Sequence, residues 1–162
     1  MTDKMEYDVI VVGGGITGAG CIRDLALRGF KVLLLEKNDM ASGASGRNHG
    51  MLHSGARYAV TDRDSAEECI RENRILRKIA AHCVDHTQGI FITLPEDDLA
   101  YQAKFIESCH AAGIEAEAID PKLALKLEPS VNPTLIGAVT VPDGAVDPFR
   151  LCHSNIIDAR LH

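Results

Sequence analysis

The sequence predicts an α/β protein whose first part is a Rossmann-like unit of strand, glycine turn, helix and second strand. Three observations support this fold: an uninterrupted apolar run at Val9–Val12, glycines at positions 13, 15 and 18, and an acidic residue, Glu36, directly after a second apolar run at residues 31–35. Such apolar runs are typical of parallel strands that helices cover on both faces. The residues from the glycines to Arg28-Gly29 are expected to form the connecting helix.

The chemistry of this unit indicates dinucleotide binding. Gly13 permits a tight turn, Gly15 lets the backbone approach a pyrophosphate without a Cβ in the way, and Gly18 lets the helix pack close to the strand. The helix N-terminus adds unpaired N–H groups and the positive end of its dipole. Glu36 follows the first glycine by about 20 residues, where a carboxylate accepts the hydroxyls of an adenosine ribose and disfavours a ribose 2′-phosphate. The motif alone does not separate NAD from FAD.

Composition restricts the class of protein. The 162 residues are 46% hydrophobic and 25% charged, which is typical of a globular protein in water. The net charge of −6 and the lack of a basic stripe interleaved with aromatics argue against a nucleic-acid partner. No apolar run reaches the length of a membrane span, and the N-terminus has no signal-peptide pattern. We therefore expect a cytoplasmic protein without direct membrane insertion, which reaches the cytoplasmic membrane only through partner subunits.

The cysteines and histidines do not predict a metal site. The odd number of cysteines and the lack of a CxxC pair favour free thiols in a reducing compartment at Cys21, Cys69, Cys83, Cys109 and Cys152. His82, Cys83 and His86 lie close together in the sequence, but no second ligand pair completes a zinc site. No metal is expected.

The next segments are a loop and a long helix. Residues 41–50 are rich in Ser, Gly and Ala, and loops of this kind beside a cofactor motif often carry function. A helix is expected from Asp64 to about Val84, with an ion pair between Glu67 and Arg71. The expected inner stripe consists of Cys69, Leu76, Ile79 and Cys83. The expected solvated face carries Arg71, Arg74, Arg77 and Lys78.

The remaining elements are read from their turn and cap residues. We expect a strand at 89–94, then a helix at 97–112 that ends at Gly113, and a strand at 116–119. The helix at 97–112 is expected to point Leu99, Ala103, Ile106 and Cys109 inward. A helix begun by Asp120-Pro121, a strand–turn–strand hairpin at 136–146 and a helix begun by Asp147-Pro148 follow. A doubly wound sheet needs a third parallel strand, and only two are found. We expect residues 1–88 to be the N-terminal part of a nucleotide-binding domain and residues 89–162 the beginning of an inserted α+β domain, both truncated.

Three segments make the prediction more specific: Leu25-Ala26-Leu27-Arg28-Gly29, the stretch from Ser45 to Tyr58 that contains Arg-Asn-His-Gly and His-Ser-Gly-Ala-Arg-Tyr, and Pro142-Asp143-Gly144-Ala145-Val146-Asp147-Pro148. With the βαβ unit, they make the chain resemble the FAD-dependent glycerol-3-phosphate dehydrogenases, and among them the large (A) subunit of the anaerobic bacterial enzymes. The resemblance covers essentially the whole chain. It implies an FAD-binding domain of glutathione-reductase type with an inserted substrate domain, as in D-amino-acid oxidases.

The resemblance also implies roles for individual residues. Gly13, Gly15 and Gly18 would hold the FAD pyrophosphate, and Glu36 the adenosine ribose. The further cofactor positions are Ser42, Ser45 and Gly46 along the pyrophosphate, and Asn48, His49 and Gly50 near the flavin. Arg57 and Tyr58 match positions that hold the substrate phosphate, for which a planar guanidinium is well suited. The residues alone leave open an ion pair of Arg57 with Asp62, and a structural role for His49 and His53.

The implied reaction is oxidation of sn-glycerol 3-phosphate to dihydroxyacetone phosphate, with hydride transfer from C2 to flavin N5. Electrons would leave through partner subunits to quinone, as in anaerobic respiration. The catalytic base remains unknown and is expected beyond residue 162, so the chain alone is expected to be inactive. Three alternatives stay open: another FAD enzyme such as a 2-hydroxyglutarate oxidase, a non-catalytic module that binds FAD or only its ADP half, and an NAD dehydrogenase.

Overall fold

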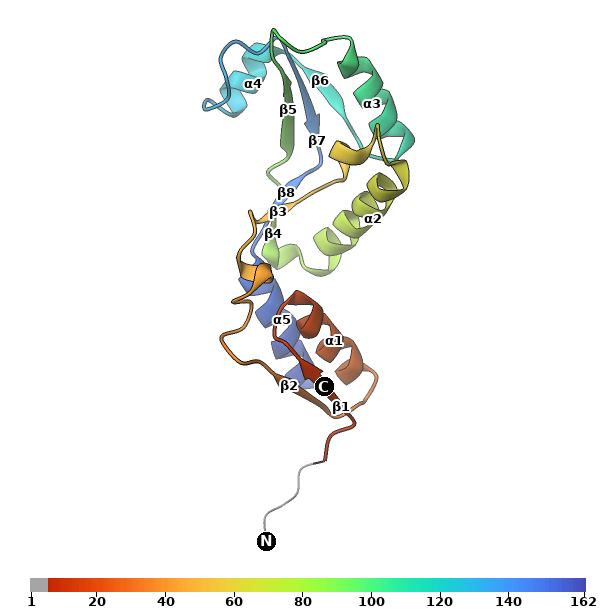
Figure 1. The fold of residues 1–162 in the computed structure, drawn as a ribbon, viewed down its shortest axis with the longest axis vertical. Coiled ribbons are helices and arrows are strands. Elements are labelled where there is room, and N and C mark those ends of the chain that lie inside the picture. Colours follow the sequence, from red (N-terminus) through yellow and green to blue (C-terminus); the bar gives the residue numbers. More distant parts are fainter. Residues whose placement is uncertain (1–5) are drawn as a thin grey trace. The chain divides into compact units, whose positions relative to one another are not determined.

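The computed structural model describes residues 6–162, which divide into two compact units (Figure 1). The first unit comprises the chain up to Gly50 together with Val146–His162, and the second comprises Met51–Ala145. The helices and strands are β1 (Val9–Val12), α1 (Ile16–Leu27), β2 (Val32–Leu35), β3 (Met51–Leu52), α2 (Arg63–Ile79), β4 (Val84–Asp85), β5 (Gly89–Thr93), α3 (Tyr101–Ala111), β6 (Glu117–Ile119), α4 (Pro121–Leu127), β7 (Gly137–Val141), β8 (Gly144–Val146) and α5 (Pro148–Leu161).

The first unit contains the predicted βαβ element. Strands β1 and β2 pair in parallel, from Val9 opposite Val32 to Val12 opposite Leu35, and α1 connects them. Helix α5 packs along α1, as Figure 1 shows, and Arg23 of α1 forms a 2.6 Å ion pair with Asp158 of α5. The core between these elements is formed by the buried side chains of Ala19, Ile22, Ala41, Cys152 and Ile156. The expected strand, helix and strand are confirmed.

The second unit is built on two small sheets. One has the strand order β3-β8-β4, and the other has β7 between its antiparallel neighbours β5 and β6. The main core of this unit contains Phe105 and Cys109 of α3, Val139 and Val141 of β7, and Ile114. Burial raises the pKa of the Cys109 thiol to about 11, so this cysteine is a neutral core residue. All five cysteines are free in the described part of the chain, as expected.

The expected hairpin at residues 136–146 is wrong. Strand β7 pairs with β5 and β6, whereas β8 pairs with β3 and β4, so the two strands belong to different sheets. Pro142 and Asp143 separate them. Pro142 has no N–H to donate to a ladder, and the buried carboxylate of Asp143 accepts hydrogen bonds from Ser54. These tertiary contacts direct the chain from one sheet into the other.

Helix α2 is shorter than expected, and it buries a different face from the predicted one. It ends at Ile79, and Cys83 lies in a short 3₁₀ turn that leads into β4. Its buried residues are Ala66, Ile70 and Asn73, while Ile79 is 64% exposed. The sequence pattern favoured the large apolar side chains. Instead, Gly55, which precedes a 3₁₀ turn at Ala56–Tyr58, lies so close to α2 that a Cβ on it would come within 2.8 Å of the Ala66 carbonyl oxygen, and the buried face therefore begins with a small residue. The ion pair of Glu67 accordingly forms with Arg63, at 2.6 Å, and not with Arg71.

The remaining helix boundaries follow their caps. The carboxylates of Asp120 and Asp147 accept backbone N–H groups at the starts of α4 and α5, and Gly113 follows α3 with a φ of +76°. These three signals are confirmed. Helix α3 begins at Tyr101, four residues later than expected, and the side chains that it buries are Phe105 and Cys109. Leu99 and Ala103 were expected inward but are exposed.

The two junctions of the compact units lie next to each other in the β3-β8 pair, where Met51 is opposite Ala145. The second unit is thus inserted into the first, and α5 returns to the first unit. The expected boundary at residue 88 lies inside the second unit, because β4 pairs with β8 across it. Which functional domains these units represent stays a prediction. No helix among residues 6–162 is long and apolar enough to cross a membrane. The same residues contain no His, Cys, Asp or Glu cluster that could hold a metal ion.

Candidate functional site

The glycine turn after β1 has the geometry that the motif predicts. Gly13 has a φ of +107°, a backbone conformation that residues other than glycine rarely adopt. A Cβ on Gly18 would clash with the carbonyl oxygen of Gly13, so only glycine lets α1 approach the turn this closely. Gly15 is the residue before the first turn of α1, and its missing side chain leaves space beside the Ser45 hydroxyl. The turn therefore exposes backbone where a pyrophosphate could approach.

Glu36 follows β2 and reaches back to this turn. Its Oε2 accepts the Gly14 N–H at 2.7 Å and its Oε1 accepts the Asn38 N–H at 2.8 Å. The hydrogen bond from Gly14, followed by that from Asn38, holds the pKa of this carboxyl below its usual range. An ionised carboxylate has about four lone-pair sites, so it retains acceptor capacity for ribose hydroxyls.

The loop at residues 41–50 is placed by its own small residues. The Ser45 hydroxyl accepts the Ile16 N–H at 2.9 Å and so lies at the N-terminus of α1. Asn48 stabilises the loop, because its side chain donates to Ser45 O and accepts from the Gly50 N–H. A Cβ on Gly46 would clash with the Ala41 carbonyl and the Phe149 ring. Ser42 is half-buried and His49 is exposed.

Together these residues fit a dinucleotide. Gly13, Gly15, Gly18, Glu36 and Ser45 lie around the start of α1, which combines backbone N–H donors, a helix N-terminus and a carboxylate. The structure connects Gly46, Asn48 and Gly50 to this group through the loop. Ser42 and His49 belong to the same loop, and their roles stay predictions.

A second group of polar residues lies in the second unit. His53, Arg57 and Asp143 line one cavity of about 290 Å³, together with Met51, Ala56, Gly89, Ile90 and Phe91. His53 Nδ1 is 3.0 Å from Asp143 Oδ2, and the Arg57 guanidinium carbon is 5.2 Å from the centre of the Tyr58 ring. The Arg57 guanidinium in a cavity of this size suits a small anionic ligand. The structure does not support the alternative ion pair between Arg57 and Asp62. The Asp62 carboxylate instead accepts hydrogen bonds from the N–H and hydroxyl of Ser65 at the start of α2.

Sequence reasoning missed three residues of this second group. Asp143 was read as a turn residue within a segment that carries the family resemblance, Asn73 was given no role, and Arg77 was assigned to a solvated face. In the structure Asn73 is buried, and Arg77 donates to the carbonyls of Pro142 and Asp143 at 2.8 and 2.9 Å. The polar residues of the Pro142–Pro148 segment were the available signal, but only long-range contacts identify their partners.

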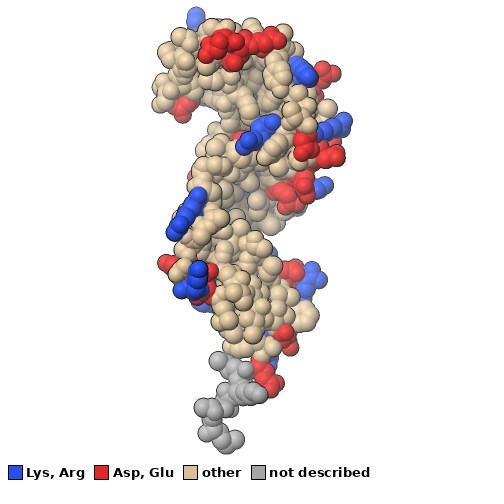
Figure 2. Space-filling model, viewed as in Figure 1, with Lys and Arg blue, Asp and Glu red and all other residues tan. Residues whose placement is uncertain are grey.

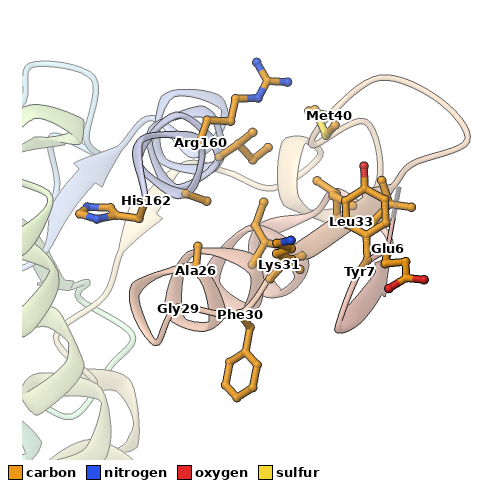
Figure 3. A pocket seen from close by; sticks show the side chains of 15 residues that line it. Glu6, Tyr7, Ala26, Gly29, Phe30, Lys31, Leu33, Met40, Arg160 and His162 are labelled. Atoms are coloured by element: carbon orange, nitrogen blue, oxygen red, sulfur yellow. The ribbon is translucent and has the colours of Figure 1, made fainter. Parts of the chain in front are cut away.

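The first unit also contains a larger cavity, of about 940 Å³ (Figure 3). Figure 3 shows Tyr7 and Lys31 from the starts of β1 and β2, with Arg160 from the end of α5. This cavity begins at Tyr7 and Lys31, which precede the strands, and its lining extends along β2 to Met40. Rossmann-like folds bind dinucleotides at the carboxyl ends of their strands, so the part of the cavity beside Tyr7 and Lys31 is not the expected cofactor site.

Comparisons with known proteins identify the family of this chain. The profile of the family described as "DAO: FAD dependent oxidoreductase" matches residues 8–162. The chain is 69% identical over 156 residues to the A subunit of anaerobic glycerol-3-phosphate dehydrogenase from Haemophilus influenzae, covering 96% of this chain and 28% of that protein. It is 65% identical over 160 residues to the protein of the same name in Escherichia coli K12, covering 99% of this chain and 30% of that protein. The chain therefore spans less than a third of the length of these relatives.

Solved structures show the same fold. Glycine oxidase from Geobacillus kaustophilus superimposes with a TM-score of 0.78 at 25% identity, over 95% of this chain and 44% of that one. Glycerol-3-phosphate dehydrogenase from Bacillus halodurans, solved with FAD, gives a TM-score of 0.65 at 24% identity, over 99% of this chain and 26% of that one. The predicted fold class and the choice of FAD over NAD are confirmed. The family profile, the glycine turn and the fold together show that this chain belongs to the FAD-dependent oxidoreductases.

Proposed function

We propose that this chain is the FAD-binding part, with a portion of the substrate site, of an enzyme that oxidises sn-glycerol 3-phosphate to dihydroxyacetone phosphate. The observation that carries the proposal is the identity of 65–69%, over nearly the whole chain, to proteins named as A subunits of anaerobic glycerol-3-phosphate dehydrogenases. Identity at this level extends through both compact units, which include the glycine turn and the Arg57 cavity.

The first unit would hold the cofactor. Backbone groups at Gly13, Gly15 and the start of α1 bind the pyrophosphate, with Ser45 beside them, while Glu36 accepts the ribose hydroxyls. Ser42, Gly46, Asn48, His49 and Gly50 supply the loop that continues toward the flavin. Bound FAD supplies the hydride acceptor for the alcohol carbon.

The second unit would bind the substrate phosphate. Arg57 offers a planar guanidinium that forms paired hydrogen bonds to phosphate oxygens, and the Tyr58 ring lies beneath it at 5.2 Å. The cavity volume of about 290 Å³ is at the lower limit for ligand sites, which favours a small metabolite. The catalytic base and the route of electrons to quinone through other subunits are assigned to parts outside residues 1–162.

A chimera tests the proposal. Residues 1–162 would replace the matched segment of the Escherichia coli relative, and the purified protein would be examined for its visible flavin spectrum. We expect bound FAD, and loss of its absorption when glycerol 3-phosphate is added without oxygen. The same measurement with 2-hydroxyglutarate should show no change.

The outcomes separate the alternatives. Flavin reduction by 2-hydroxyglutarate but not by glycerol 3-phosphate would replace this proposal with a 2-hydroxy-acid oxidase. Bound FAD that neither substrate reduces would leave a cofactor-binding module without this activity.

A further inference from the structure

Asp143 is a buried carboxylate in the connection between β7 and β8. Its Oδ1 accepts two hydrogen bonds from Ser54, one from the N–H at 2.7 Å and one from the hydroxyl at 2.6 Å. Its Oδ2 lies 3.0 Å from His53 Nδ1. Both oxygens of the carboxylate are therefore engaged by two consecutive residues of the segment that lines the Arg57 cavity.

The surrounding structure fixes the position of this carboxylate. Arg77 donates to the backbone carbonyls of Pro142 and Asp143, and its own orientation is held by Asn73 Oδ1 at 2.7 Å. Asn73 in turn donates to the carbonyls of Leu52 and His53. A Cβ on Gly89 would come within 2.9 Å of the Asp143 Cβ, so glycine there leaves the space that Asp143 occupies. The contacts hold both ends of the His53–Asp143 pair.

The chemistry of the pair determines which ring nitrogen carries the proton. An ionised carboxylate is only an acceptor, so His53 Nδ1 must donate to it. In the neutral ring Nε2 is then the acceptor. The His53 side chain is 34% exposed and lines the cavity that also contains Arg57, whereas the Asp143 side chain is 6% exposed.

We propose that Asp143 is a positioning residue that holds His53 in the Nδ1–H tautomer and orients Nε2 as an acceptor in the Arg57 cavity. This inference rests on the proposed function, because it assigns the cavity to a phosphorylated alcohol whose phosphate binds Arg57 and whose hydroxyl donates to His53 Nε2. Asp143 also lines this cavity, but its side chain is only 6% exposed and both of its oxygens are engaged by His53 and Ser54.

The tautomer is measured directly on this chain by long-range proton–nitrogen correlation NMR in alkaline buffer, where imidazole is neutral. His53→Gln assigns the signal. We expect the Nδ1–H form in the unmodified chain. In Asp143→Asn the amide oxygen can still accept from Ser54, while the amide NH2 now donates to His53 Nδ1, so the ring proton should move to Nε2. The matched control is Asp120→Asn, which changes a capping carboxylate of the same unit and should leave His53 unchanged.

The tautomer of His53 in the unmodified chain tests the proposal even if Asp143→Asn does not fold. An Nε2–H ring there would overturn the proposal. An unchanged tautomer in a folded Asp143→Asn chain would overturn it as well. In the chimera we expect Asp143→Asn to lower kcat/KM for glycerol 3-phosphate by about tenfold, because an Nε2–H ring can no longer accept a hydrogen bond from the substrate hydroxyl. An unchanged kcat/KM despite a switched tautomer would remove the positioning role.

These measurements keep the two proposals apart. If the tautomer behaves as expected but the chimera does not reduce its flavin with glycerol 3-phosphate, the proposed substrate is wrong and the orientation of His53 by Asp143 stands. If the chimera is active and His53 carries its proton on Nε2, the proposed function stands and the role of Asp143 fails.

Discussion

At the scale of single residues, Glu36 is the side chain that we propose binds the adenosine ribose of the cofactor. Its two oxygens accept N–H groups from Gly14 and Asn38, and these hydrogen bonds lower the pKa of the carboxyl. Glu36 therefore fixes the glycine turn relative to the end of β2 and keeps its negative charge at neutral pH. Both effects support binding of an adenosine ribose.

We expect Glu36→Gln to weaken binding of ADP to this chain by about tenfold, because charge-assisted hydrogen bonds are worth roughly 1.5–3 kcal/mol. Isothermal titration calorimetry measures this, with Glu107→Gln, an exposed change on α3, as the control. An unchanged affinity would contradict the assignment of Glu36.

Glu36 also predicts an acid dependence of stability. Because its pKa is lowered in the folded chain, its contribution is fully present above the usual glutamate pKa and is lost as the pH falls through the lowered value. Urea unfolding at several pH values should show a smaller loss of stability on acidification for Glu36→Gln than for the unmodified chain. Equal losses would show that the Gly14 and Asn38 hydrogen bonds do not persist in solution.

In the proposed function, Arg57 binds the substrate phosphate. Arg57→Lys keeps the charge but loses the planar fork, so in the chimera we expect KM for glycerol 3-phosphate to rise about tenfold with unchanged flavin content. Steady-state kinetics measure this, and oxidation of glycerol, which has no phosphate, should differ little. Arg63→Lys on the exposed surface of α2 is the control. Loss of flavin in Arg57→Lys would instead assign Arg57 to folding or to the cofactor.

At the scale of elements, the close packing of α1 on the glycine turn decides the shape of the cofactor site. Gly18 faces the Gly13 carbonyl, and no side chain can occupy the space between them. Gly20 lies in the same helix, and a Cβ there would have nothing within 4 Å. Substituting each glycine therefore distinguishes the effect of close packing, at Gly18, from the effect of helix propensity alone, at Gly20.

We expect Gly18→Ala to destabilise the chain by about 2 kcal/mol and to abolish measurable ADP binding, because α1 must move away from the turn. Gly20→Ala should leave ADP binding unchanged and stabilise the chain by up to about 1 kcal/mol, because alanine favours helix. Urea unfolding and calorimetry test both variants. Similar behaviour of the two would show that the turn tolerates a side chain.

At the scale of the whole molecule, the parallel sheet of the first unit has an exposed apolar face. Val12 is 82% exposed, Ile10 is 58% exposed and Leu35 is 48% exposed, although all three belong to its strands. Figure 2 shows wide areas without charged side chains on the visible face of the molecule. Exposed apolar strand faces promote association.

We expect the chain alone to self-associate at micromolar concentration. Sedimentation velocity measures this association, which Val12→Lys should reduce, whereas Ile79→Lys on the surface of α2 should leave it unchanged.

We also expect the chain alone to show no turnover of glycerol 3-phosphate with an artificial electron acceptor. Turnover by the isolated chain at a rate close to that of the chimera would contradict the expectation that it lacks part of the active site.

The sequence alone determined the elements whose causes are local. The spacing of Gly13, Gly15 and Gly18 and the position of Glu36 predicted the βαβ unit, because turn geometry and strand length depend on neighbouring residues. The same holds for the starts of α4 and α5, where Asp120 and Asp147 accept N–H groups two or three residues further on. The fold class and a dinucleotide site could therefore be predicted from the order of the residues, whereas the choice of FAD rested on the resemblance to the glycerol-3-phosphate dehydrogenases.

Only the tertiary structure decided the pairings between distant segments. Asp143 meets His53 and Ser54 across about 90 residues of sequence. Arg77 donates to the carbonyls of Pro142 and Asp143, and β7 and β8 join different sheets where a hairpin was expected. Strand pairing and burial of a helix face depend on which surfaces meet, and periodicity carries no information about the partner. The cofactor loop was thus predicted from the sequence, whereas the His53–Asp143 pair in the Arg57 cavity became visible only when the chain was folded.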